Sequence, residues 1–322
     1  MCTAVSFKTR NHYFGRNLDL ECGFQESVVI TPRHYPFVFR RMPAMKKHFA
    51  LIGMASVVND YPLYYEATNE HGLSMAGLNF PKNAFYPPEE AGRDNVSPFE
   101  LIPYILGQCE NVIQAKALLA RTHIAAIHFS DALRLSPLHW MIADREASIV
   151  VESMLDGLHI HDNPVGVMTN NPPFDFHMTN LSQYTALSPG QPKSLFGSVE
   201  LTLPSRGMGS LGLPGDLSSP SRFIRAAFTK AYSICGEDEA SSVTQFFHIL
   251  GSVRHVRGSV MVGDRPEITL YACCCNTDKG VYYYQTYENS RICAVDMRKE
   301  DLDSASLIRY PLQRSQDFCN QN

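Results

Sequence analysis

Apolar and polar residues alternate along the first part of the chain with the period of two that is typical of half-buried β-strands. Short alternating runs follow one another up to residue 79, separated by turn-forming residues, as in a succession of hairpins. The pattern predicts strands at residues 3–8, 12–17, 27–32, 49–57, 62–68 and 73–79.

Helix signals begin after this region. Ser97-Pro98-Phe99-Glu100 has the composition of a capping box with proline at the first helical position, and it predicts a helix to about Gly107. In the same way, Ser219 as N-cap and Pro220 predict the start of a later helix. The further predicted helices are at 112–121, 175–187, 220–234 and 239–250, and the further predicted strands are at 138–143, 147–153, 157–161, 166–170, 267–276, 279–287 and 291–297.

This order of strands, helices and strands indicates an α+β protein. It permits two sheets stacked face to face with helices on each outer side. A doubly wound parallel sheet is disfavoured, because its strands would alternate with helices. No linker or repeat divides the chain, although residues 188–217 are rich in Gly, Pro and Ser. We therefore expect one domain over residues 1–322.

The composition is that of an ordinary soluble enzyme. A chain of 322 residues with 44% hydrophobic content can bury a large core. A net charge of −4 gives no basic field for nucleic acid. The longest apolar stretch, Phe49 to Val58, is far shorter than the ~20 residues that a membrane span needs. We expect neither a nucleic-acid nor a membrane partner.

The nine cysteines are odd in number and irregularly spaced, which favours reduced thiols. No charged and apolar leader precedes Cys2, so we expect a cytoplasmic protein. Cys273-Cys274-Cys275 points to alternate faces of a strand and matches no metal motif, which indicates core packing. His159 and His161 share a strand face without a third ligand nearby in sequence. We expect no metal.

The run Gly207-Met208-Gly209-Ser210-Leu211-Gly212 matches a dinucleotide-binding pattern. Pro214 and Gly215 follow, however, where the helix that cradles the phosphates should begin. We interpret this run as a mobile loop that shapes the mouth of an active site, and we expect no cofactor.

Cys2 is the strongest candidate for chemistry. Cysteine is small enough for routine removal of the initiator methionine, so the mature chain should begin with Cys2 and carry a thiol and a free α-amine on one residue. An unperturbed thiol has a pKa of roughly 8.5 and an α-amine a pKa of roughly 7.7–8.0, so the amine can take the thiol proton near neutral pH.

A cation and a carboxylate follow on the strand that should pair beside the N-terminus. Residues 12–17 lead directly into Arg16-Asn17-Leu18-Asp19. Arg16 would favour the thiolate of the cysteine, and Asp19 would hold and orient its amine.

Five motifs occur in one order along the chain. They are Cys2-Thr3-Ala4, Phe14-Gly15-Arg16-Asn17-Leu18-Asp19, Ala76-Gly77-Leu78-Asn79-Phe80-Pro81, Thr169-Asn170-Asn171-Pro172 and Gly215-Asp216-Leu217-Ser218-Ser219-Pro220-Ser221-Arg222-Phe223. With this set the chain resembles the choloylglycine hydrolase family from Cys2 to about Leu312, and within it the bile salt hydrolases of gut Gram-positive bacteria. The resemblance implies the αββα four-layer sandwich of the N-terminal nucleophile hydrolases, with two stacked, mainly antiparallel sheets.

The resemblance also implies roles for three further residues. Acyl transfer develops an oxyanion, which needs fixed donors. Asn170 would present its side-chain amide, Asn79 a backbone or side-chain N–H, and Arg222 a cation near the nucleophile. Each has a structural alternative: the asparagines can cap turns, and Arg222 can pair with Asp216 or Glu21. The expected catalytic set is Cys2, Arg16, Asp19, Asn79, Asn170 and Arg222.

Substrate selection is expected from apolar residues. Leu18, Phe24, Phe129 and Leu133 align with family positions that line the acyl pocket, although each is equally compatible with core packing. Cys22 stands where some relatives carry an aromatic residue. This departure leaves the width of the pocket and the preference for glycine or taurine open.

These features predict an amidase that cleaves the bond between a bile acid and glycine or taurine through a thioester. The alternatives are a penicillin V acylase of the same family and a catalytically silent ligand-binding protein. Asn79 favours conjugated bile acids as substrates, because relatives that act on penicillin V tend to carry Tyr there. Relatives also suggest a homotetramer.

Overall fold

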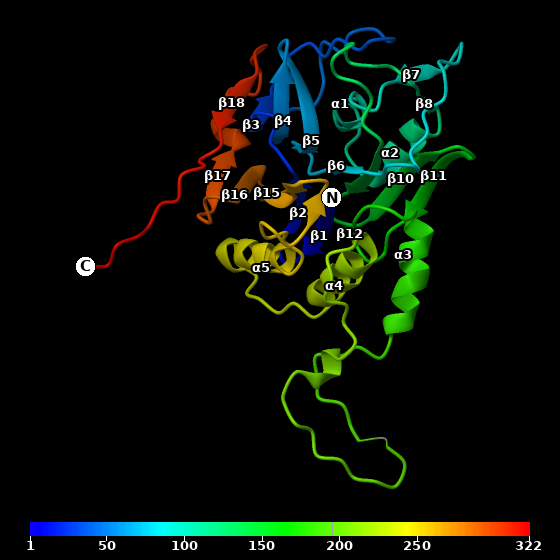
Figure 1. Cartoon of the computed structure of the whole chain (residues 1–322). Coiled ribbons are helices and arrows are strands. Elements are labelled where there is room, and N and C mark those ends of the chain that lie inside the picture. The colour runs from blue at the N-terminus through cyan, green and yellow to red at the C-terminus, as the bar shows by residue number, and fades with distance from the viewer. Residues whose placement is uncertain (195) are drawn as a thin grey trace.

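Two antiparallel sheets stack at the centre of the molecule (Figure 1). The structure is a computed structural model that describes residues 1–194 and 196–322. The six-stranded sheet has the order β12 (Val167–Met168), β1 (Cys2–Lys8), β2 (His12–Leu20), β15 (Ile268–Asn276), β16 (Val281–Thr286) and β17 (Cys293–Asp296). The eight-stranded sheet has the order β11 (Gly157–Asp162), β10 (Ser148–Met154), β9 (Leu138–Ala143), β6 (Ser74–Asn79), β5 (Tyr61–Asn69), β4 (Leu51–Val58), β3 (Ser27–Thr31) and β18 (Ile308–Pro311).

Helices cover the outer face of each sheet. On the six-stranded sheet lie α4 (Ser219–Ala231) and α5 (Glu239–Gly251), with α3 (Phe174–Leu181) beside α4. On the eight-stranded sheet, α1 (Leu101–Leu106) and α2 (Val112–Leu119) share an apolar cluster with β4, β5 and β9. The expected α+β class and αββα sandwich are confirmed.

The central strand β2 is buried almost throughout, because the second sheet covers one face and helices cover the other. Its side chains alternate between these surroundings. Arg16 reaches across to the main chain of β5 and β6, whereas Asn17 donates to the carbonyl of Leu250 in α5. Polar residues of one short motif therefore reach two different layers.

Gly15 is required by the spacing between β2 and β15. A Cβ atom at this position would lie 1.9 Å from the carbonyl oxygen of Cys273. The glycine lets the two strands approach, and the residues that follow it are placed by that approach.

Two predicted helix starts are wrong by one to three residues. Helix α1 begins at Leu101 rather than Pro98, because the Ser97 hydroxyl donates to the carbonyl of Ile127 instead of capping. The N-cap of α4 is Ser218 rather than Ser219, since the Ser219 hydroxyl accepts from the N–H of Asn170.

Several short elements were not predicted. They are β7 (Asp94–Val96), β8 (Thr122–Ile124), β13 (Met261–Val262), β14 (Arg265–Pro266), the 3₁₀ turns η1 (Ser182–Tyr184), η2 (Met208–Ser210) and η3 (Met297–Lys299), and the edge strand β18. The predicted strand at 291–297 is present as β17, but β18 follows it, so it does not close the chain. The predicted helix at 175–187 is α3 followed by η1.

The glycine-rich run at 207–212 contains η2 and lies in the long connection between η1 and α4, of which residue 195 is outside the described residues. Figure 1 shows this connection extending beyond α3 and α4, away from the N-terminus. Within one molecule, the run therefore does not lie at the mouth of a site around Cys2, and the expectation that it shapes such a mouth is wrong.

None of the helices in the described ranges is long and apolar enough to span a membrane.

Candidate active site

Cys2 opens β1 at the centre of the molecule, where Figure 1 marks the N-terminus. Its residue is only 2% exposed. It lies opposite Leu18 in the β1–β2 pair, so its side chain shares a strand face with Leu18 and Arg16. This face looks toward the second sheet.

The main chain of Cys2 is held on both sides. Its N–H donates to Asn170 Oδ1 at 2.7 Å, and its carbonyl accepts from Arg222 Nη1 at 2.5 Å. Arg222 also donates to the Thr3 hydroxyl at 2.7 Å and to Asn170 Oδ1 at 2.8 Å. Arg222 therefore connects α4 to the beginning of β1, and it bonds neither Asp216 nor Glu21.

Asn170 of the Thr169-Asn170-Asn171-Pro172 motif makes hydrogen bonds with both its main chain and its side chain. Its side-chain N–H donates to the carbonyl of Asn79 at 2.7 Å, and its own N–H donates to Ser219 Oγ at 2.8 Å. His177 Nε2 lies 2.9 Å from its carbonyl. Because an amide nitrogen carries two hydrogens, a second donor of Asn170 is left for a ligand.

Arg16 is completely buried between the two sheets. Its Nη1 donates to the carbonyls of Gly77 at 2.6 Å and Tyr65 at 3.2 Å, and its Nε lies 3.8 Å from Glu66 Oε2. The Tyr65 carbonyl is available because a bulge shifts the β4–β5 register there. Burial alone lowers the pKa of Arg16, but the acidic groups of Cys2, Tyr271 and Glu66 outweigh it and raise that pKa.

Asp19 contacts the N-terminal residue through its main chain. The Met1 ammonium donates to the Asp19 carbonyl at 2.6 Å and to Glu267 Oε2 at 2.7 Å, and the Asp19 N–H donates to the Met1 carbonyl at 2.9 Å. The Asp19 carboxylate accepts from the Thr269 hydroxyl at 2.6 Å, next to a bulge between Thr269 and Tyr271. With Met1 attached, the nitrogen of Cys2 is an amide.

The expected pocket residues lie in different surroundings. Leu18 is buried in the core, whereas Phe24 and Leu133 are exposed in loops. Phe24 is held by its carbonyl, which accepts from the Ser56 hydroxyl at 2.6 Å. Phe129 packs on Phe99 and under the Arg40 guanidinium.

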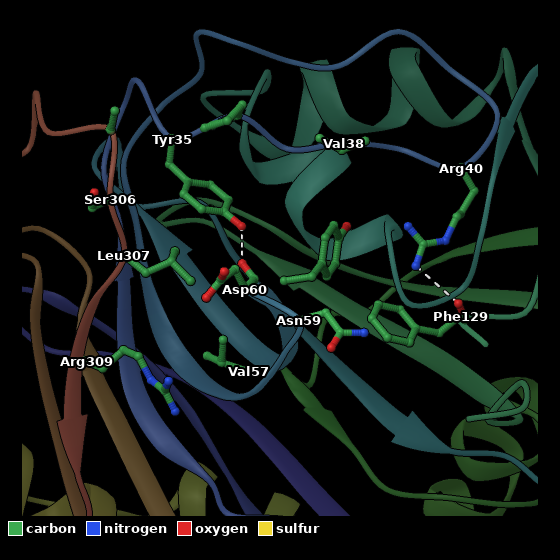
Figure 2. A pocket seen from close by; sticks show the side chains of 13 residues that line it. Tyr35, Val38, Arg40, Val57, Asn59, Asp60, Phe129, Ser306, Leu307 and Arg309 are labelled. Carbon is green, nitrogen blue, oxygen red and sulfur yellow. Dashed lines mark hydrogen bonds between the residues drawn. The ribbon is translucent and has the colours of Figure 1, made fainter. Parts of the chain in front are cut away.

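Phe129 also lines a cavity of about 630 Å³ on the outer side of the β4–β5 hairpin (Figure 2). Tyr35 donates there to the carbonyl of Asp60, and Arg40 donates to the carbonyl of Phe129. None of the six expected catalytic residues lines this cavity. We therefore do not assign the reaction to this cavity, despite its volume.

The alternative thiols and metal ligands are accounted for by packing. Cys273, Cys274 and Cys275 are buried in β15, which confirms the expected core placement, and burial raises the pKa of the Cys275 thiol to about 12. Within residues 1–194 and 196–322, no group of three or more His, Cys, Asp or Glu side chains is arranged to hold a metal ion.

Thr3, Ser219, Glu267 and His255 contact this site and were missed as functional residues. Thr3 and Ser219 lie inside the recognised motifs, so their neighbours gave a signal. Glu267 and His255 precede β15 without any motif, and only the fold brings them to the N-terminus.

The arrangement suits acyl transfer by an N-terminal thiol. A buried cysteine side chain shares its strand face with a guanidinium, while the Asn170 amide oxygen accepts from its N–H and the Arg222 guanidinium donates to its carbonyl. A family model described as linear amide C–N hydrolases, choloylglycine hydrolase family, matches residues 2–310. The chain belongs to this family. It is an amidase, as expected from the sequence.

Relatives within the family match over their full length. The chain is 52% identical to the bile salt hydrolase/transferase of Lactiplantibacillus plantarum and 38% identical to that of Clostridium perfringens, each over 100% of both chains. The crystal structure of the C2A mutant of the conjugated bile acid hydrolase from Clostridium perfringens superposes with a TM-score of 0.93 at 37% identity, covering 100% of both chains.

A more distant structure shows the same fold. The penicillin V acylase from Agrobacterium tumefaciens matches with a TM-score of 0.75 at 17% identity, covering 98% of this chain and 94% of that one. At this identity the likeness concerns the fold alone.

Proposed function

We propose that this choloylglycine hydrolase is a bile salt hydrolase, which cleaves the amide bond of bile acids conjugated to glycine or taurine. The observation that carries the proposal is the full-length similarity at 52% identity to a bile salt hydrolase/transferase, combined with Cys2 at the centre of the site. The proposed active form is the single domain of residues 2–322, from which Met1 has been removed.

In the proposed reaction, the Cys2 thiol attacks the substrate carbonyl and its proton passes to the α-amine. The tetrahedral intermediate then collapses as the C–N bond breaks, and the ammonium returns the proton to the leaving amine. Water, deprotonated by the same amine, hydrolyses the thioester and releases the bile acid.

The surrounding residues are assigned by their contacts. Arg16 favours the thiolate, and the Asp19 carbonyl, which accepts from the Met1 ammonium, would accept from the amine of Cys2 once Met1 is removed. Asn170 has two roles. Its Oδ1 lies 2.7 Å from the Cys2 nitrogen and would hold the amine, and its remaining side-chain N–H, which has no partner among the described residues, can donate to the substrate. With Asn79, it would stabilise the oxyanion. Arg222 fixes the main chain of Cys2.

The proposed acyl pocket includes Phe24 and Leu133, whose exposure leaves them free to contact a steroid, together with Leu18 and Phe129 from its wall. We also propose a cytoplasmic location, from the odd number and irregular spacing of the cysteines, and a homotetramer, as the family resemblance suggests. Light scattering of the purified protein tests the assembly, and a monomer or dimer would contradict it.

The deciding experiment compares turnover of glycocholate, taurocholate and penicillin V by purified protein that lacks Met1. We expect a much higher kcat/KM for the bile salts, because discrimination lies in the acyl pocket and the nucleophile is common to all three. Faster cleavage of penicillin V than of both bile salts would overturn the substrate assignment and leave the family membership unchanged.

A further inference from the structure

A buried acid–histidine pair lies directly beside the N-terminus. Glu267 is 3% exposed and His255 is fully buried. His255 Nδ1 lies 2.9 Å from Glu267 Oε1, and its Nε2 lies 3.9 Å from Asp19 Oδ2. The imidazole therefore stands between two carboxylates, one of which belongs to the expected catalytic set.

The pair is held in place by β15. The Thr269 hydroxyl donates to Asp19 Oδ1 at 2.6 Å and accepts from the N–H of His255 at 2.8 Å, and the N–H of Thr269 donates back to the carbonyl of His255. A single threonine thus fixes the histidine and the aspartate relative to each other. The bulge that follows Thr269 occurs only at this point of the β2–β15 pair.

Two polar atoms of this cluster lack a hydrogen-bond partner within the described chain. They are Asp19 Oδ2 and His255 Nε2, which lie 3.9 Å apart, whereas His255 Nδ1 and Glu267 Oε1 face each other at 2.9 Å. Buried polar atoms are rarely left without partners unless they serve a ligand, a water or a reaction. Two such atoms and an acid–histidine pair beside one chain terminus indicate a site that is arranged around that terminus.

The Met1 ammonium shows what this site binds. It lies 2.7 Å from Glu267 Oε2 and forms an ion pair with it. Once Met1 is removed, the new α-amine begins one residue further along, a distance of about 3.8 Å between successive Cα atoms. The Glu267 carboxylate then remains close enough to act on that amine directly or through one water.

We propose that Glu267, connected through His255 to Asp19, is a positioning residue that holds the freed α-amine of Cys2 and supports its action as a base. The inference rests on the proposed function. When the amine takes the thiol proton it becomes an ammonium, and a nearby carboxylate stabilises that product. The proton then leaves with the amine of the substrate, so Glu267 itself gains and loses none.

The charges around the amine come from several elements. Arg16 of β2 and Arg222 of α4 lie near Cys2, and Glu66 of β5 lies behind Arg16. Asp19 of β2 is near Arg222 and Arg254, and His255 and Glu267 belong to the same segment as Arg254, between α5 and β15. Burial lowers the pKa of Arg222, and the charges of Asp19, Cys2 and Glu267 oppose this effect. Burial alone raises the pKa of Glu267, but contact with His255 and with the Met1 ammonium outweighs it and lowers that pKa. Glu267 is therefore an anion at neutral pH.

The test is the pH dependence of kcat/KM in a Glu267→Gln variant of the enzyme lacking Met1. A base must be neutral to accept the thiol proton, so the acid limb of the profile reports the pKa of the amine. Removing a negative charge lowers that pKa, so we expect the acid limb to move to lower pH by about one unit, with a lower maximal rate. Glu267→Asp, which keeps the charge but withdraws it by one methylene, should move the limb in the same direction by less.

The matched control is Glu288→Gln, because Glu288 is an exposed glutamate that pairs with Arg257 at the surface. Its profile should equal that of the wild type. A folded Glu267→Gln variant with an unchanged acid limb would overturn the proposal. If that variant does not fold, an unchanged limb in Glu267→Asp has the same consequence. The profiles are measured with whichever amide substrate the wild type cleaves fastest. The test of Glu267 then does not depend on whether that substrate is a bile salt.

Discussion

The polar side chains around Cys2 include two that hold its main chain and a cation that shares its strand face. Asn170 and Arg222 bind the N–H and the carbonyl, whereas Arg16 shares the strand face of the thiol. Cys2→Ser should therefore remove the chemistry and leave the structure. We expect kcat to fall by ~10³-fold or more with an unchanged unfolding midpoint, because a hydroxyl is far harder to deprotonate. Cys319→Ser, at an exposed thiol near the C-terminus, is the control and should keep full activity. Near wild-type turnover of Cys2→Ser would contradict the assignment.

Arg16 has a structural role that can be separated from its chemical one. Glu66 is buried and accepts from the hydroxyls of Tyr271 and Tyr282, and Arg16 is the cation nearest to it in the described chain. Arg16→Met leaves this carboxylate without its cation, and we expect a loss of about 3–5 kcal/mol in denaturant unfolding. Adding Glu66→Gln should restore part of the stability but not the activity. A fully active double variant would show that Arg16 is not needed for the reaction.

The contact between β2 and β15 gives a prediction about whole strands. Because a Cβ at Gly15 would overlap the carbonyl of Cys273, Gly15→Ala has to separate two buried strands. We expect a loss of about 1–3 kcal/mol in urea unfolding, together with reduced activity, because β2 also carries Arg16 and Asp19. Gly251→Ala, at the end of α5 where a Cβ meets nothing within 4 Å, should be neutral or slightly stabilising. Equal effects of the two substitutions would contradict this account.

Local sequence patterns predicted the elements whose partners lie nearby in the chain. The β1–β2 hairpin follows from alternation and a short turn, and it alone places Arg16 beside Cys2. The edge strand β18 was missed because Ile308–Pro311 gains its partner, β3, only through the fold. Ser219 was misplaced for the same reason, since its hydroxyl serves Asn170 rather than its own helix. No local sequence pattern points to Glu267, because its role depends on contact with the N-terminus, and only the complete fold creates that contact.

Buried histidines make the stability of the whole molecule depend on pH. Burial lowers the pKa of His12 and of His177 to about 4 each. Between pH 4 and the unfolded value of about 6.5 the unfolded chain binds more protons, so stability rises with pH across this window and is lost as pH falls through it. We expect a decrease of a few kcal/mol in the free energy of unfolding from pH 6.5 to 4, measured by denaturant titration. In a His12→Gln variant, the free energy of unfolding should change less steeply with pH over this range than in the wild type. An unchanged pH dependence would show that His12 does not contribute to it.

The position of the N-terminus is a property of the complete fold, and it makes the mature start of the chain testable. Figure 1 shows the N-terminus among the central strands while the C-terminal tail leaves the body of the molecule. The Met1 ammonium is engaged by Asp19 and Glu267, and the nitrogen of Cys2 is then an amide that cannot accept a proton. A protein carrying a protease-cleavable extension that ends immediately before Cys2 should therefore be folded but inactive. Cleavage should restore full turnover, with mass spectrometry confirming that the chain begins at Cys2. Activity of the uncleaved form at the level of the cleaved one would show that the free α-amine is not the base, and it would remove the basis for the roles given to Asp19 and Glu267 as well.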